Sequence, residues 1–435
     1  MLNNFIYSQT KDLFLEKLEA GQILNEAIVF IEETGEIWNR GNYFGSQTDF
    51  ESLFGTIEST GGSEAILTIS DANSNPEIPV DGDTDWIVGK RCLAKNTSDG
   101  VAICYLSDTD STKFADGSNA ALDGSMGEFM VHFPENYVTC EESNGVTTVT
   151  VSDSDGTATF REVLVGAVHA TAIEGDTTAL HSVVNGNPPA TNATIVDFHN
   201  AAIANGTGWD IMDYETRNKI TILAYAKYGT RDLQDIIGVG DAGYGFIEGS
   251  TVSLGNSDGS TTNATGNINN SILGIENYFN NVVDFLGGIH AYNNGRTVTY
   301  YIYDGVDIAN GTPSTSYRTL QLNISLAGDA GINISKMKWG EYADLFPIAS
   351  DGDGEIFNTY YTDGATVIGN DLAADRVDVP ITIVVVGGVV AIPPGGGAGL
   401  RADFPPSVAG EFCGARLQYR GNITIIDNPE EFKQL

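Results

Sequence analysis

The side chains best suited to acid–base, redox or metal chemistry are spread thinly along this chain. No two histidines stand three or four residues apart, the spacing that places two metal ligands on one face of a helix. The cysteines form no Cys-x-x-Cys pair, so we expect neither a zinc site nor a disulfide framework and interpret them as small buried side chains. These residues are His132, His169, His181, His199, His290, Cys92, Cys104, Cys140 and Cys413. The pattern predicts no catalytic residue and no required cofactor.

Acidic residues at alternate positions are the other chemical signal, and Ca²⁺ is the ion they would suit. Hard oxygen ligands on a tight loop match its coordination, and Asp351, Asp353 and Glu355 form the best such run. No acidic run completes an EF-hand loop, and solvated turns are the simpler explanation. We keep these three as weak candidate ligands. A glycosidase would need only two carboxylates, which this acidic chain supplies without a distinctive motif.

The most distinctive stretch is a glycine- and proline-rich segment at 387–412. It follows a β-branched strand predicted at 381–386 and leads into Gly414-Ala415-Arg416-Leu417 on a closing strand. Glycine and proline suppress helix and strand, so we expect the surroundings to hold this backbone and its side chains to be displayed to a partner. The candidate receptor-binding residues are Val389, Val390, Ile392, Arg401, Asp403, Phe404, Glu411 and Phe412.

Several side chains of this segment have an alternative interpretation. Phe404 or Phe412 would equally fill the core beneath the loop, and the apolar valines and isoleucine would suit packing against a neighbouring subunit. Arg416 is expected to anchor the closing strand by pairing with a buried carboxylate or with carbonyl groups.

Composition and charge narrow the class of protein. The 435 residues suggest more than one ordinary domain, and a hydrophobic content of 41% supplies a core. A net charge of -37 would repel phosphate backbones and anionic lipid, so we expect no nucleic-acid partner. No stretch is apolar enough for membrane insertion, and the N-terminal residues lack the pattern of a signal peptide. The negative charge leaves two alternatives, a cationic partner and bound divalent ions.

Apolar periodicity predicts a mixed α+β fold with two helices and long loops. The best helix runs over 213–228 with Asp213 as its N-cap, and a second is predicted over 275–286, ending at Gly287-Gly288. Residues 238–270 are predicted to form an exposed insertion loop, and residues 106–123 a long acidic loop. Strands are predicted at 65–69, 101–106, 128–133, 147–151 and 160–167.

Residues 1–50 are a different kind of sequence. A short helix at 12–20 and a hairpin with strands at 27–31 and 36–38 bury too little area to stand alone, so this segment needs a partner. Its candidate attachment residues are Phe30, Ile31, Ile37 and Trp38. The alternative is a terminal hairpin packed on the rest of its own chain. Residues 51–85 are predicted to be a linker or small β-element, and residues 86–435 the main domain.

Short motifs over about 86–421 occur in the order found in one known family. They are Trp86 to Arg91, Gly127 to Pro134, Val163 to Ala167, Gly208 to Met212, Ala224 to Gly229, Gly274 to Asn277, Gly387-Gly388, Gly397 to Leu400, Pro406-Ser407 and Gly414 to Leu417. This region resembles the C-type lectin-like domains related in fold to the formylglycine-generating enzymes. Such domains end fibre and receptor-binding proteins of bacteriophages, including crAss-like gut phages, and residues 28–45 resemble the N-terminal segments of such fibres.

The resemblance implies a non-enzymatic virion protein, a head or tail fibre made in the host cytoplasm. It would be a homo-oligomer, with a trimer expected, bound to capsid or tail proteins through its N-terminus and to a host-surface glycan or protein through its C-terminal domain. A formylglycine-generating enzyme is one alternative, but it would need paired cysteines near the C-terminal end, where Cys413 stands alone. A bacterial adhesin tip is the other alternative, and it would need a secretion signal.

Overall fold

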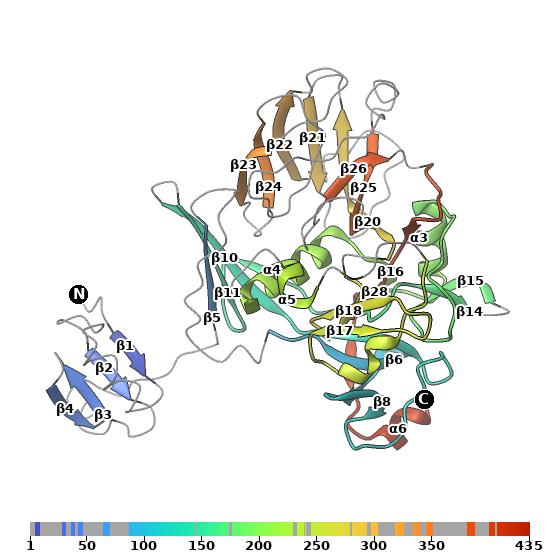
Figure 1. Cartoon of the computed structure of the whole chain (residues 1–435), viewed down its shortest axis with the longest axis horizontal. Helices are drawn as coiled ribbons and strands as arrows, with labels where there is room; N and C mark the ends of the chain where they lie inside the picture. The colour runs from blue at the N-terminus through green and yellow to red at the C-terminus, as the bar shows by residue number, and fades with distance from the viewer. Residues whose placement is uncertain are drawn as a thin grey trace. The chain divides into compact units, whose positions relative to one another are not determined.

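In the computed structural model, the side chains of residues 87–289 and 407–435 are described, apart from gaps at 142–147, 172–178, 229–232, 234–235, 239, 241–244 and 279–280. Elsewhere it describes backbone strands alone. The chain divides into two compact units, Met1–Gly61 and Gly62–Leu435. Helices and sheets are mixed along the chain, so the fold is α+β (Figure 1).

The N-terminal unit contains a four-stranded sheet in the order β1-β2-β3-β4. Its strands are Phe5–Ser8, Ile28–Ile31, Glu36–Asn39 and Asn42–Ser46. β2 pairs antiparallel with β3 in the region where the hairpin was predicted, and β1 pairs with β2 in parallel. Phe30, Ile31, Ile37 and Trp38 lie on this hairpin. The predicted helix at 12–20 lies outside the described residues.

The larger unit is organised around an eight-stranded sheet, ordered β16-β28-β13-β9-β6-β7-β29 with β8 added to β7. Its strands are β6 Lys90–Thr97, β7 Gly100–Ser107, β8 Asp110–Phe114, β9 Glu128–Phe133, β13 Val163–Gly166, β16 Trp209–Ile211, β28 Leu417–Tyr419 and β29 Ile423–Ile425. Successive side chains of a strand point to opposite faces. Leu93 and Phe129 therefore enter one apolar cluster, while their neighbours Cys92 and Met130 enter another. Both faces of the central strands are covered, which explains their nearly continuous apolar sequence.

A second sheet, ordered β12-β10-β11-β5, packs beside the main one through residues of the first cluster, including Val138, Val149 and Val151. Its strands are β5 Glu64–Ile69, β10 Asn136–Ser143, β11 Val146–Ser152 and β12 Ala158–Phe160. β5 matches the strand predicted at 65–69, and it pairs antiparallel with β11 over six residue pairs. The segment predicted at 160–167 forms two strands, β12 and β13.

The remaining strands form smaller sheets and one six-stranded sheet, ordered β22-β21-β20-β25-β26 with β27 on β20. They are β14 Thr171–Ile173, β15 Asp176–His181, β17 Gly259–Thr262, β18 Ile268–Ile272, β19 Ile275–Glu276, β20 Val283–Asn293, β21 Thr297–Ile302, β22 Arg318–Ser325, β23 Ile334–Trp339, β24 Leu345–Ser350, β25 Ile381–Gly387, β26 Leu400–Phe404 and β27 Cys413–Gly414. β25 is the strand predicted at 381–386.

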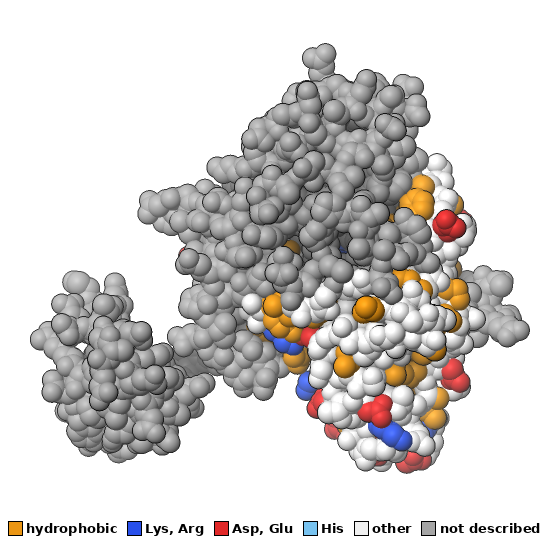
Figure 2. Space-filling view, in the orientation of Figure 1, with side chains coloured by type: hydrophobic (Ala, Val, Ile, Leu, Met, Phe, Trp, Pro, Cys, Tyr) orange, Lys and Arg blue, Asp and Glu red, His pale blue; other side chains and the backbone are white. Residues whose placement is uncertain are grey.

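Helices cover parts of this unit. They are α3 Ile195–Ile203, α4 Tyr214–Tyr228, α5 Leu233–Ile237 and α6 Pro429–Lys433, with one 3-10 turn, η1, at Ser250–Leu254. α4 is the helix predicted at 213–228, and Asp213 caps it by accepting from the Thr216 backbone N–H at 2.8 Å. Figure 2 shows apolar side chains interspersed with polar ones over the described face of this unit.

The predicted helix at 275–286 is wrong. Ile275 and Glu276 instead form β19, which turns back onto β18 at Leu273 and Gly274, both with positive φ (49° and 83°). Asn277 and Asn281 also have positive φ (53° and 73°), which interrupts any helix. The apolar spacing that suggested a helix belongs to a hairpin followed by β20, and the two glycines lie at a register shift within β20.

The two predicted loops are also wrong. Residues 238–270 include η1 and β17, and the polar side chains of Glu248, Thr251, Asn269 and Asn270 are buried. Residues 106–123 include β8, which pairs with β7. In residues 238–270 these polar side chains bond to partners inside the fold, so polarity alone gave the wrong burial there, whereas Asp108, Asp116 and Asp123 of the other segment are exposed.

α3 was not predicted, although its start carries a capping signal. The Thr194 hydroxyl accepts from the Asp197 backbone N–H at 3.2 Å, and Asp197 accepts from the Thr194 backbone N–H at 2.9 Å. Thr194→Ala should lower the free energy of unfolding by about 1 kcal/mol, because the Asp197 backbone N–H loses the hydroxyl that accepts from it. Urea denaturation measures this, with Thr194→Ser as the control that keeps the cap. An equal loss in the serine variant would contradict the capping role.

Candidate functional site

Most sequence-predicted site residues lie outside the described side chains. Arg401, Asp403 and Phe404 belong to β26, of which the backbone alone is described. Glu411 is exposed, whereas Phe412 is half-buried against the second apolar cluster, as the core-filling alternative expected. Val389, Val390, Ile392, Asp351, Asp353 and Glu355 lie outside the described residues.

The cysteines are placed as expected for small buried side chains. Cys92, Cys104 and Cys413 are buried, and Cys140 is half-buried. Burial raises the pKa of the Cys104 thiol to about 11. A thiol with a raised pKa is a poor nucleophile at neutral pH.

Arg416 lies at the centre of a fully buried polar cluster. Its guanidinium donates to the carbonyl oxygens of Gly166 (3.1 Å), Glu276 (3.0 Å) and Asn277 (3.3 Å). It also pairs with the carboxylate of Asp284 at 3.5 Å. These partners belong to β13, to β19 and the residue after it, and to β20. One side chain therefore ties the C-terminal strands to three other segments, which confirms the predicted anchoring role of Arg416.

His169 lies against Arg416 in the same cluster. His169 Nε2 lies 3.0 Å from Arg416 Nη2 and 3.4 Å from Asp284 Oδ1, and His169 Nδ1 lies 2.6 Å from Glu248 Oε1. Burial and Arg416 oppose a positive charge on this ring, but Glu248 and Asp284 outweigh them and raise the pKa of His169. Burial would raise the pKa of Asp284, but His169 and Arg416 outweigh it and lower that pKa to about 2.

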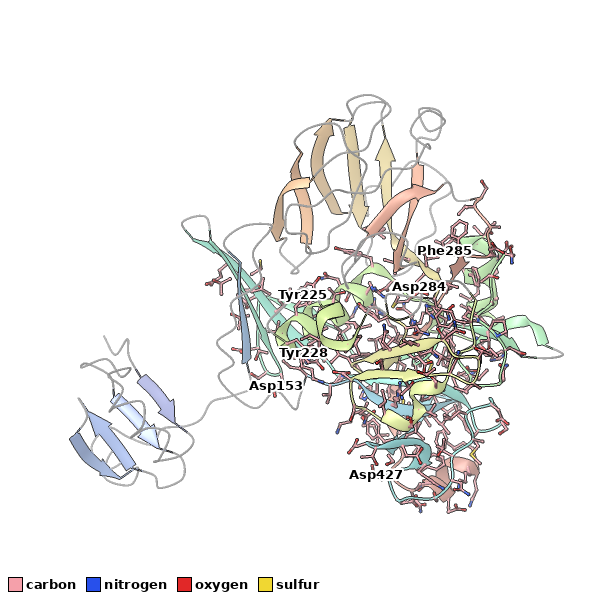
Figure 3. The ribbon with its side chains drawn as sticks, viewed as in Figure 1. Asp153, Tyr225, Tyr228, Asp284, Phe285 and Asp427 are labelled. Atoms are coloured by element: carbon pink, nitrogen blue, oxygen red, sulfur yellow. The ribbon has the colours of Figure 1, made fainter. Side chains whose placement is uncertain are left out.

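This acid–base cluster is closed to solvent. His169 is 1% exposed, Glu248 8% and Asp284 2%, so a substrate could not reach the groups most able to transfer a proton. Asp284 is followed on β20 by Phe285, which packs into the second apolar cluster (Figure 3). The position of the cluster between packed segments indicates a structural role.

A second buried arginine, Arg91 of β6, is satisfied at every N–H group. Nε donates to the Gly274 carbonyl (2.8 Å), and Nη1 donates to the Thr251 carbonyl (2.8 Å) and the Ser111 hydroxyl (3.3 Å). Nη2 donates to the hydroxyls of Thr251 (2.8 Å) and Ser271 (3.3 Å). Arg91 thus fixes the turn at Gly274 and the 3-10 turn η1 onto the main sheet.

Glu276 completes this arrangement from the other side. Its carboxylate accepts from the Gly249 backbone N–H (2.7 Å), from the Asn269 side-chain amide (2.6 Å), and from the backbone N–H (3.1 Å) and hydroxyl of Thr251. Burial raises the pKa of Glu276. Thr251 therefore links Arg91 to Glu276. The polar side chains of Thr251 and Asn269 in residues 238–270 are needed to bond these two buried charges.

Tyr105, His132 and Glu162 form a chain that resembles a nucleophile, a base and an orienting carboxylate. The Tyr105 hydroxyl lies 2.7 Å from His132 Nδ1, and His132 Nε2 lies 2.8 Å from Glu162. Burial raises the pKa of Tyr105 to about 12, so its hydroxyl is a poor nucleophile at neutral pH. His132 is 4% exposed, which leaves little access for a substrate.

Residues 255–259 read Gly-Asn-Ser-Asp-Gly, a pattern that our sequence analysis did not identify and that matches the nucleophile elbow of α/β-hydrolases. That elbow places its serine on a strand-to-helix turn. Here Ser257 instead lies between η1 and β17, and the next residue, Asp258, pairs with Lys227 at 2.7 Å. The structural context therefore does not fit a hydrolase.

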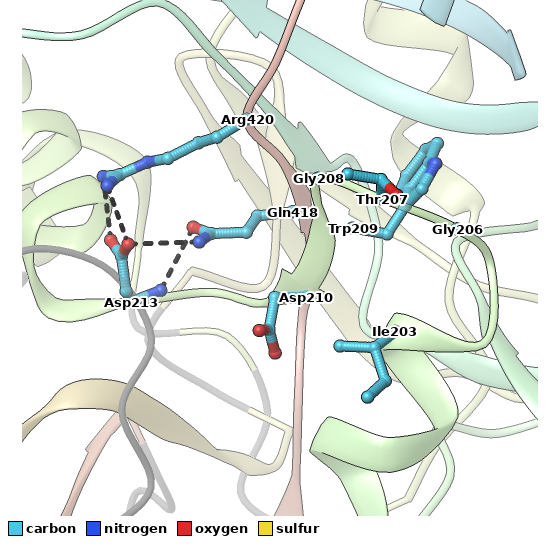
Figure 4. A pocket seen from close by; sticks show the side chains of 9 residues that line it. All are labelled: Ile203, Gly206, Thr207, Gly208, Trp209, Asp210, Asp213, Gln418 and Arg420. Carbon is cyan, nitrogen blue, oxygen red and sulfur yellow. Dashed lines mark hydrogen bonds and ion pairs between the residues drawn. The ribbon is translucent and has the colours of Figure 1, made fainter. Parts of the chain in front are cut away.

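An open groove of about 620 Å³ lies beside β16 and β28 (Figure 4). The two strands pair antiparallel, with Asp210 opposite Gln418. Trp209 and Tyr419, the neighbouring pair on the two strands, pack together with ring centroids 5.1 Å apart, and Trp209 also borders the groove. The groove is lined by Ile203, Gly206, Thr207, Gly208, Trp209, Asp210, Asp213, Gln418 and Arg420.

Arg420 closes one end of this groove, and the sequence analysis did not single it out. It pairs with Asp213 at 2.9 Å and with Glu215 at 3.2 Å. Gln418 Nε2 also donates to Asp213, at 3.1 Å. Arg420 follows closely after the Gly414 to Leu417 motif, and this position in the sequence is the feature that could have identified it as a candidate site residue. Asp213 both caps α4 and receives these two side chains, so this wall of the groove is rigid.

Comparison with known protein families and with curated proteins finds no match for this chain. Among the residues that the structure describes, no three His, Cys, Asp or Glu side chains are grouped so as to hold a metal ion. None of the described helices has the length and apolar character of a membrane span.

Proposed function

We propose that this protein is a non-catalytic component of a bacteriophage virion, a head or tail fibre. In this proposal the N-terminal residues, with the predicted helix and hairpin, attach the chain to capsid or tail proteins. The larger unit is a C-type lectin-like receptor-binding domain that displays loops to a host-surface glycan or protein. The active form is a homo-oligomer, with a trimer expected.

The observation that carries the proposal is that the buried charges of the larger unit hold loops in place. Arg91 and Arg416 are both 0% exposed, and most of their bonds go to turns and to backbone carbonyls. Both arginines come from motifs that underlie the resemblance to lectin-like domains, as do Gly166, Gly274 and Asn277. A rigid scaffold with fixed loops is what a receptor-binding surface requires.

The burial of reactive groups favours binding over catalysis. His169, Asp284 and Cys413 are all at most 2% exposed. A formylglycine-generating enzyme would need a reactive cysteine that its peptide substrate can reach, and Cys413 packs in an apolar cluster.

The division into two compact units supports a separate attachment segment and supplies the test. Light scattering of the full chain should give a stable oligomer, about three chain masses, whereas residues 62–435 alone should be a folded monomer. Circular dichroism and thermal melting of residues 62–435 control for loss of folding. Monomers in both samples would contradict the attachment and oligomerisation role.

A further inference from the structure

The groove beside β16 and β28 contains one charged side chain with an open coordination position. Asp210 Oδ1 accepts from His199 Nδ1 and from the Ile211 backbone N–H, both at 2.7 Å. Asp210 Oδ2 accepts no hydrogen bond from any residue that the structure describes. In Figure 4 the Asp210 carboxylate stands between the Asp213 wall and the Ile203 side of the groove. The Asp210 side chain is 17% exposed, so a ligand in this groove can donate a hydrogen bond to its open oxygen in place of solvent.

The other charges of the groove are already neutralised within the protein. Arg420 pairs with Asp213 and Glu215, and the Gln418 amide is bonded to Asp213. The guanidinium is therefore unavailable to an anion. Asp210, by contrast, meets the imidazole of His199 and no lysine or arginine within ion-pair distance among the described residues. Burial, the largest influence on this carboxyl, raises the pKa of Asp210, as expected where compensating charge is lacking.

The end of α3 adds a negative potential at the same place. Ile203, the last residue of α3, lines the groove, and the last turn of this helix carries no basic side chain. The carbonyl groups at a helix C-terminus bear partial negative charge and favour cations. Two independent features, a carboxylate and a helix C-terminus, therefore attract positive charge into one groove.

We propose that this groove, which Thr207 also lines, binds a primary ammonium group held by the open oxygen of Asp210. The groove volume, about 620 Å³, is within the range of small-molecule pockets. Gly206 leaves room for the ligand, because a Cβ there would meet nothing closer than Trp209 Cδ1 at 3.9 Å. The site is independent of the fibre proposal, since it rests on these contacts alone.

The test uses the full chain labelled with ¹⁵N-tryptophan, because Trp209 lines the groove and the chain has four tryptophans. Four probes are titrated at matched ionic strength: glucosamine, Nα-acetyl-lysine amide, glucose and glucuronate. We expect the two ammonium probes to shift the Trp209 indole N–H resonance and the neutral and anionic sugars to leave it unchanged. The ammonium probe that binds more tightly indicates whether the natural ligand carries its amine on a sugar or on an alkyl chain.

Three variants separate this site from general attraction to an acidic protein. Asp210→Asn should weaken ammonium binding at least tenfold by removing the charge. Thr207→Lys, at an exposed position, should block the site with its own ammonium. Asp123→Asn, the same charge change in an exposed turn, should bind as the wild type does. The proposal is overturned if neither ammonium probe shifts the resonance, if glucose shifts it equally, or if Asp210→Asn and Thr207→Lys both bind normally.

Discussion

Arg416→Met should lower the free energy of unfolding of the larger unit by about 3–5 kcal/mol, because it leaves a buried charge without its partner. Asp284 is 2% exposed and would lose its ion pair, and three carbonyl oxygens would lose their donor. Methionine retains much of the aliphatic volume, so the effect reports lost polar contacts more than a cavity. Urea denaturation followed by tryptophan fluorescence measures it.

A surface arginine in the same unit provides the matched control. Arg161 is 46% exposed and pairs with Glu215 at 2.7 Å, so Arg161→Met should cost at most about 1 kcal/mol. Adding Asp284→Asn to Arg416→Met should destabilise less than the sum of the two single variants, because the stranded charge is then removed. Similar losses for Arg161→Met and Arg416→Met would contradict the anchoring role.

The parts of this fold that the sequence predicts are those with one strong local signal. The strand at Glu128–Phe133 is mostly apolar, and it was predicted with the correct bounds. Asp213 before an apolar helix predicted a cap, and the cap is present. The anchoring role of Arg416 followed from a basic side chain on a strand expected to be buried, which requires an acceptor.

The parts that local signals miss depend on pairing across long sequence separations. Residues 275–286 have helical spacing, yet pairing of β19 with β18 and of β20 with β25 determines their structure. Glu276 is 0% exposed because Asn269, Thr251 and Gly249 supply its donors, and composition does not reveal such partners. The groove could not be predicted for the same reason, since it unites Asp210 with Arg420, far apart in the sequence.

The buried network and the groove have different physical roles although both consist of charged residues. In the network around Arg416, partners surround each charge and water is excluded, which stabilises one arrangement of loops. In the groove, Asp213 and Arg420 neutralise each other, while Asp210 keeps an oxygen available. Buried charges enclosed by charged and polar partners indicate a structural role, and an acceptor that is open to a groove can hold a ligand.

Lys219 should make the stability of the larger unit depend on pH above neutrality. This lysine of α4 is 1% exposed, and its ammonium donates to the carbonyl oxygens of Pro134, Phe160 (3.4 Å) and Arg161 (2.9 Å). Burial, reinforced by the charge of Arg420, lowers the pKa of Lys219 to about 7. In the unfolded chain this pKa returns to its ordinary value near 10.5.

The sign of the effect follows from proton binding. Between these two pKa values the unfolded chain holds a proton on Lys219 that the folded protein has released, so stability rises with pH in this window. Relative to Lys219→Met, which has no proton to lose, the wild type should gain about 1.4 kcal/mol per pH unit at most, or about 2 kcal/mol between pH 7 and pH 9. Urea denaturation of both proteins at pH 6, 7, 8 and 9 measures this difference.

Lys433→Met, which removes a partly exposed ammonium on α6, should differ from the wild type by a constant amount over the same range. A constant difference for Lys219→Met as well would mean that the three carbonyl groups keep the ammonium charged in the folded protein, because each such bond favours the protonated form.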